Sequence, residues 1–87
     1  MKIRLWDEIF PLGDKGLLLF TDHLEETLLT GFSMKDARGK VHRVSKVEVQ
    51  EDWFALLVDS GEAAYFERLF RDVRVDALTM EVCAECP

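Results

Sequence analysis

The sequence contains few cysteines, few prolines and no long apolar run. Of its 87 residues, two are cysteines, Cys83 and Cys86, and two are prolines. Two cysteines near one end cannot form the disulfide framework that stabilises many small secreted domains. A membrane-spanning helix needs about 20 apolar residues, and every apolar run in this sequence is far shorter. The first residues alternate charged and apolar side chains, unlike a secretory signal. We therefore expect a cytoplasmic domain with no membrane partner.

Positive charge is also scarce, and this disfavours one class of partner. The chain has 17 acidic and 11 basic residues, which give a formal net charge of −6. Such a surface repels the phosphate backbone of DNA, so we do not expect DNA binding. Five basic residues nevertheless gather in one short segment, which is the candidate surface for RNA: Lys35, Arg38, Lys40, Arg43 and Lys46. The alternative interpretation is a solvated basic hairpin beside the acidic segment from Glu48 to Glu67.

The sequence lacks a recognisable catalytic constellation. It contains no Gly-x-x-x-x-Gly-Lys-[Ser/Thr] phosphate-binding loop,. Ser33, Ser45 and Ser60 have no histidine and carboxylate partners at a signature spacing. His23 and His42 lie in charged segments and are interpreted as surface residues. We expect neither enzymatic activity nor a bound cofactor.

Apolar and aromatic residues, in contrast, are abundant and lie in short strand-like patterns. Hydrophobic residues make up 48% of the chain and include six phenylalanines and two tryptophans, which is enough for one core,. Apolar segments between turns predict about six strands, at residues 2–10, 17–21, 32–35, 40–50, 52–59 and 73–82. Apolar residues at helical spacing predict one short helix from Glu62 to Phe70, with Ser60 as its N-cap.

We expect these elements to form a single all-β domain over residues 1–87. Six short strands in so small a chain favour a closed or partly open β-barrel, because closure removes exposed strand edges. The alternative is a two-layer sheet with the helix packed on one face. The ordered core should cover about residues 2–82, followed by a C-terminal tail at 83–87. Its buried side chains are expected to include Leu5, Leu18, Phe20, Val47, Phe54, Leu56, Val58, Phe66 and Val75.

The order of several segments matches a known pattern. Ile9 to Thr21 contains a phenylalanine, a glycine-containing loop and an apolar strand, and Leu28 to Gly31 places leucine and glycine before the next strand. The apolar strand Trp53 to Val58, the short helix and the strand at 73–82 then follow. In this order the chain resembles the second domain of translational GTPases such as elongation factor Tu, which is a β-barrel. The resemblance implies a barrel that serves as a contact surface for protein or RNA.

The resemblance does not extend to GTPase activity. The chain has no phosphate-binding loop, and Asp22 and His23 stand where the family has an arginine and a glycine,. Fold is in any case weak evidence for function.

The last residues contain a Cys-x-x-Cys motif, formed by Cys83 and Cys86. A tetrahedral zinc site needs four ligands, and the only other histidine or cysteine side chains are His23 and His42, which nothing in the sequence places nearby. A redox pair of the thioredoxin type begins a helix, whereas this motif lies next to the last residue. Thiols without a role, a metal site shared between chains and redox chemistry all stay open.

Trp6 is the remaining candidate for a binding residue. It lies on the opposite face of the first strand from Ile3 and Leu5, among charged residues. An exposed tryptophan can anchor an interface, and the alternative is that it closes one end of the barrel. The favoured function is a non-catalytic module that binds a protein partner or a second copy of itself. The alternatives are RNA or ribosome contact through residues 35–46, and metal or redox chemistry at Cys83 and Cys86.

Overall fold

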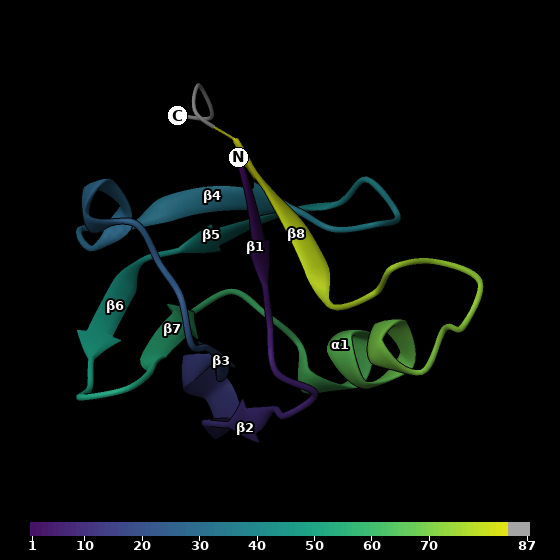
Figure 1. Ribbon diagram of the computed structural model, residues 1–87. Helices are drawn as coiled ribbons and strands as arrows, with labels where there is room; N and C mark the ends of the chain where they lie inside the picture. The colour runs from purple at the N-terminus through teal and green to yellow at the C-terminus, as the bar shows by residue number, and fades with distance from the viewer. Residues whose placement is uncertain (84–87) are drawn as a thin grey trace.

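The computed structural model describes residues 1–83, which form two four-stranded antiparallel sheets and one short α-helix (Figure 1). Sheet A has the order β1-β8-β4-β5, with the strands β1 (Lys2–Arg4), β8 (Thr79–Cys83), β4 (Phe32–Lys35) and β5 (Val41–Val44). Sheet B has the order β2-β3-β7-β6, with the strands β2 (Phe10–Pro11), β3 (Leu17–Thr21), β7 (Phe54–Val58) and β6 (Lys46–Val49). Short 3-10 turns cover Gly13–Lys15 and Glu26–Leu28.

The prediction of an all-β domain with one short helix is confirmed, although residues 1–83 contain eight strands and not about six. The strands of residues 1–83 stay in two separate sheets and form no closed barrel. The long strand expected at 40–50 is divided because the chain leaves sheet A after β5 and enters sheet B at β6 (Figure 1). Ser45 marks this change, and its backbone N–H donates to the carbonyl of Leu57 at 2.9 Å. Val44 and Val47 are an odd number of residues apart and would point to opposite faces of one continuous strand. Because the chain changes sheet between them, both side chains face the core.

The strand expected at 73–82 is shorter than predicted, because it begins only at Thr79. The Asp72 carboxylate accepts a hydrogen bond from the backbone N–H of Arg74 at 3.0 Å. The Asp76 carbonyl accepts one from the backbone N–H of Thr79 at 3.2 Å. Local turns of this kind compete with strand pairing for the same backbone groups. Residues 71–78 therefore form a loop between the helix and β8 (Figure 1).

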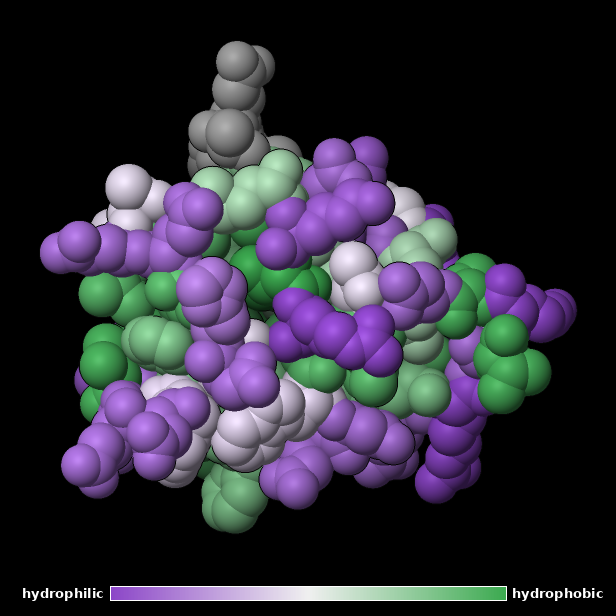
Figure 2. Space-filling view, viewed as in Figure 1, coloured by the Kyte–Doolittle hydropathy of each residue, from purple (hydrophilic) through white to green (hydrophobic). Residues whose placement is uncertain are grey.

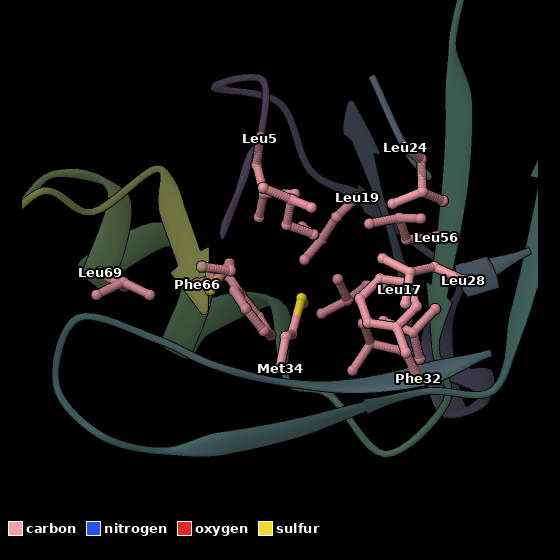
Figure 3. Packing of buried hydrophobic residues seen from close by; sticks show 14 of the residues in the cluster. Leu5, Leu17, Leu19, Leu24, Leu28, Phe32, Met34, Leu56, Phe66 and Leu69 are labelled. Carbon is pink, nitrogen blue, oxygen red and sulfur yellow. The ribbon is translucent and has the colours of Figure 1, made fainter. Parts of the chain in front are cut away.

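The core lies between the inner faces of the two sheets and is closed at one side by α1 (Ala63–Phe70) (Figure 3). In Figure 3, Leu17, Leu19 and Leu56 of sheet B point toward Phe32 and Met34 of sheet A. Leu24 and Leu28, from the connection between β3 and β4, pack against the same cluster.

Four of the predicted core residues are buried, and two others were assigned to the wrong face. Leu5, Leu56, Val58 and Phe66 are at most 2% exposed, and Val47, Phe54 and Val75 are half-buried at the edge of the core. Leu18 and Phe20 point away from the core, while Leu17 and Leu19 fill it. A strand that is apolar at nearly every position does not reveal which of its two alternating sets of side chains faces inward, so this prediction was wrong for β3,.

The helix begins at Ala63, and Glu62 is its N-cap instead of the predicted Ser60. It buries Phe66 and Leu69 against the core, while Tyr65 and Phe70 are half-buried. Among residues 1–83, no helix has the length and hydrophobicity required to cross a lipid bilayer.

Candidate functional site

Four of the five basic residues predicted to form one RNA surface lie in the β4–β5 hairpin of sheet A, and the fifth lies in sheet B. Lys35 and Arg43 extend from the outer face of sheet A, because the alternate residues Met34 and His42 point into the core. Lys46 belongs to sheet B. Their separation follows from the change of sheet at Ser45.

Arg38 and Lys40 lie in the turn between β4 and β5, where other side chains already engage them. The Arg38 guanidinium binds the Asp72 carboxylate at 3.0 Å. The Lys40 ammonium lies 4.4 Å from the ring centroid of Tyr65, a cation–π contact,. RNA contact through residues 35–46 stays a prediction.

The same turn contains a buried polar network centred on Asp36, whose side chain is 0% exposed. Its Oδ1 accepts the backbone N–H groups of Arg38 and Lys40 at 2.9 and 3.0 Å. Its Oδ2 accepts hydrogen bonds from His42 Nε2 at 2.8 Å and from the Tyr65 hydroxyl at 2.6 Å. The interpretation of His42 as a surface residue was wrong: it is buried and packs against Phe66, with ring centroids 4.6 Å apart.

The network holds Asp36 ionised and Tyr65 neutral. Burial by itself raises the pKa of Asp36, but the hydrogen bonds from Tyr65 and His42 outweigh it and lower the pKa below its ordinary value of 3.8,. Burial, followed by the bond to Asp36, raises the pKa of Tyr65 to about 12. Four donors occupy both oxygens of this carboxylate, so it joins the β4–β5 turn to α1 as a structural element.

The predicted metal site is only partly described. Cys83 is the last residue of β8 and lies opposite Ser33 of β4, whereas Cys86 lies outside the described residues. Within residues 1–83, no three His, Cys, Asp or Glu side chains are grouped so that they could hold a metal ion. Metal or redox chemistry at this motif stays a prediction.

Trp6, predicted as a binding residue, belongs to a cluster of three aromatic rings. Its ring centroid lies 6.1 Å from that of Phe20 and 6.0 Å from that of Trp53, and Phe20 and Trp53 are 5.6 Å apart. The Trp6 backbone N–H donates to the carbonyl of Phe20 at 2.8 Å, which holds the end of the first segment beside β3. All three side chains are half-buried.

The strand register extends this cluster into a larger apolar surface on the outer side of sheet B. Leu18 pairs with both Phe10 and Leu57, so these three residues share a face with Phe20. Phe10 is 57% exposed, and Leu18 and Leu57 are half-buried. We call this surface the aromatic face: Trp6, Phe10, Leu18, Phe20, Trp53 and Leu57.

Exposed carboxylates follow or precede the aromatic residues in sequence. Glu48 lies on the same face as Ala55 and Phe20 through the register of β6, β7 and β3. Lys46, opposite Leu57, lies on this face as well. The acidic rim is defined as the exposed carboxylates Asp7, Glu8, Asp22, Glu48, Glu51 and Asp52.

Sequence reasoning found only one member of the aromatic face, because Phe20 and Leu18 were assigned to the core. The signal that could have identified the others is the period of two in the apolar segment at 17–21. It requires one of the two alternating sets to face outward.

Comparisons of the chain with protein-family models, with curated proteins and with solved structures give no match. The resemblance to the second domain of translational GTPases therefore stays a prediction.

Proposed function

We propose that this domain is a non-catalytic binding module whose aromatic face receives a segment of a partner protein. The observation that carries the proposal is the position of Trp6, Phe20 and Trp53, which cluster on the outer side of sheet B and not in the core. Tryptophan and other aromatic residues dominate the energetics of protein interfaces. A contiguous exposed apolar surface on a small domain commonly marks an interaction site.

The charge around the aromatic face indicates the chemistry of the partner. The acidic rim supplies six exposed carboxylates, and Lys46 is a base on the same face as Leu57. Charged groups at the edge of an interface select a partner of opposite sign and accelerate its association. The segment that fits should therefore combine an apolar or aromatic anchor with lysine or arginine residues.

The same rim disfavours the two other occupants. In a two-fold dimer the same surface patch meets itself, so two acidic rims would face each other and repel. A single-stranded RNA needs stacking aromatics interleaved with a positive groove, whereas these aromatics are interleaved with carboxylates. A cytoplasmic location stays part of the proposal and is not needed for it.

Intrinsic fluorescence provides a direct test, because both tryptophans of the chain, Trp6 and Trp53, belong to the aromatic face. Selection of a displayed library of random peptides against the domain should enrich sequences that combine basic and aromatic residues. Titration of a selected peptide should shift the tryptophan emission. Phe10→Ser should weaken this binding by roughly 30-fold, because an interface anchor contributes about 2 kcal/mol.

Val41→Ser is the matched control, because Val41 is 49% exposed and lies on sheet A. It should leave peptide affinity unchanged, and both variants should keep the wild-type circular dichroism spectrum. Selected peptides that bind Phe10→Ser as tightly as wild type would refute the proposal. So would acidic selected peptides, preferential binding of an RNA oligonucleotide, or a dimer in sedimentation that Phe10→Ser dissolves.

A further inference from the structure

Four arginines gather around one hollow beside the loop that follows α1, although the chain as a whole is acidic. The hollow has a volume of about 390 Å³ and is lined by Arg38, Arg68, Arg71, Asp72, Val73 and Arg74. We call it the arginine hollow. At the right edge of Figure 2, hydrophilic side chains lie next to hydrophobic ones. The hydrophobic Val73 is 96% exposed.

The carboxylate of Asp72 fixes two of the four guanidinium groups. Its side chain is only 7% exposed, and it binds Arg38 Nη2 at 3.0 Å through Oδ2. It also binds Arg74 through two bonds, Nε to Oδ1 at 3.0 Å and Nη2 to Oδ2 at 3.3 Å. These bonds lower the pKa of Asp72 well below its ordinary value, the bond from Arg74 having the largest effect. The two guanidinium groups are thus positioned before any ligand arrives.

The charges of the hollow do not cancel. Asp72 is the one carboxylate that lines the hollow, and Arg71 also borders a second hollow with Asp7 and Glu67, so four guanidinium groups meet three carboxylates. Guanidinium stays protonated at any physiological pH. Arg68 lies in the last turn of α1, where a cation is favoured by the helix dipole without any ligand,. That explanation does not apply to Arg38 and Arg74, which reach the hollow from the β4–β5 turn and from the loop. Asp72 holds both of these guanidinium groups, and its single negative charge balances only one of them.

We propose that the arginine hollow binds a phosphate monoester, carried either on a small molecule or on a phosphorylated side chain of a partner protein. Guanidinium groups match the oxygens of a phosphate with paired hydrogen bonds, and a monoester supplies two negative charges in a compact group. The site is distinct from the aromatic face and does not depend on it.

A compact anion fits better than a nucleic-acid strand. The whole chain carries 17 acidic residues and 11 basic ones, four of which are the arginines of the hollow. A strand extending beyond the hollow would therefore run over a surface dominated by carboxylates, which repel its next phosphates.

The test uses three probes with the isolated domain: free O-phosphoserine, a phosphoserine peptide with its unphosphorylated form, and a single-stranded RNA oligonucleotide. Calorimetric titration should detect phosphoserine but not the unphosphorylated peptide. The amide resonances of Asp72 and Arg74 should shift in a heteronuclear spectrum. Equal affinity for free phosphoserine and the peptide identifies a small-molecule ligand, whereas tighter binding of the peptide identifies a phosphorylated protein.

Arg71→Gln is the test variant, because Arg71 is exposed and its replacement should preserve the fold. It should weaken phosphoserine binding roughly tenfold, the effect of losing one charge-assisted hydrogen bond. Arg43→Gln, on the outer face of sheet A, is the control and should bind like wild type. The proposal is overturned if phosphoserine does not bind, if Arg71→Gln and Arg43→Gln bind it equally, or if only the RNA binds.

Discussion

The outer faces of the two sheets present opposite chemistry to their surroundings. On sheet A, the register places Lys2 and Lys35 on either side of Glu81, so opposite charges alternate across neighbouring strands. On sheet B, the corresponding surface is the aromatic face. Both sheets contribute leucine, valine, methionine or phenylalanine to the same core. The charged face is typical of a sheet surface that only meets water, and the aromatic face is typical of one that meets another molecule.

The inner faces differ as well. The inner side of sheet A carries His42, which with Asp36 and Tyr65 forms a buried polar network. The inner side of sheet B contributes leucine and valine to the core: Leu17, Leu19, Leu56 and Val58. A buried polar network specifies one arrangement of its partners, whereas an apolar surface tolerates several. We therefore expect the two sheets to respond differently to substitution.

The largest effect is expected where sheet A meets the helix. Asp36→Ala removes the acceptor of four hydrogen bonds and leaves His42, Tyr65 and two backbone N–H groups without it. Each buried donor left without its partner costs about 1–3 kcal/mol, so the total approaches the whole stability of a small domain. Denaturant unfolding should show this loss. Asp76→Ala is the control, because Asp76 and its partner Arg4 are both 68% exposed; its cost should be about 1 kcal/mol or less,. Equal losses in the two variants would contradict a special role for the network.

The next effect compares the two faces of sheet B within one strand. Leu56 is 0% exposed in the core, and its neighbour Leu57 lies on the aromatic face. Leu56→Ala should destabilise the domain by about 2–5 kcal/mol, the cost of a cavity in a packed core. Leu57→Ala makes the same chemical change and should cost about 1 kcal/mol, because the side chain is only half-buried. Denaturant midpoints that shift equally would show that the aromatic face is part of the core.

A smaller effect is expected from the phenol of Tyr65 and its dependence on pH. The folded-state pKa of this group, about 12, lies above its ordinary value of 10.0, because the phenol is partly buried and donates to Asp36. The stability that it contributes is complete below pH 10 and is lost as the pH rises through about 12,. Since Tyr65 is the only tyrosine of the chain, phenolate absorbance reports on it alone. At neutral pH, Tyr65→Phe should cost about 1.5–3 kcal/mol. A phenol that titrates near pH 10 while circular dichroism shows a folded domain would be inconsistent with the bond.

The smallest effect is expected at the end of sheet A. Cys83 shares a face with Ser33 and Glu81 through the register of β4 and β8, away from the core cluster. Replacing Cys83 and Cys86 together by serine should leave the thermal midpoint unchanged, with or without added zinc, because the Cys83 side chain lies outside the core cluster and chain ends contribute little to stability. Stoichiometric zinc in the purified wild-type protein would contradict this and would favour a metal site shared between chains.

Local pattern was sufficient to predict the all-β class and the helix ending at Phe70. Both depend on the spacing of apolar residues over a few positions, which can be read directly from the sequence. The same reasoning could not predict which side of Leu17–Thr21 faces inward, because the segment is apolar at nearly every position. That choice depends on which residues of β7 and sheet A lie opposite, and these come from distant parts of the chain.

The sequence by itself thus determined the composition of the domain, its acidic charge, its strand-rich class and its short helix. Only the tertiary structure decided that Trp6, Phe20 and Trp53 form one surface and that Arg38 joins three arginines from the end of α1 and the loop after it. It also decided that His42 is buried beside Asp36. The physical reason is that strand pairing and side-chain packing join residues far apart in sequence, and local periodicity carries no information about such contacts.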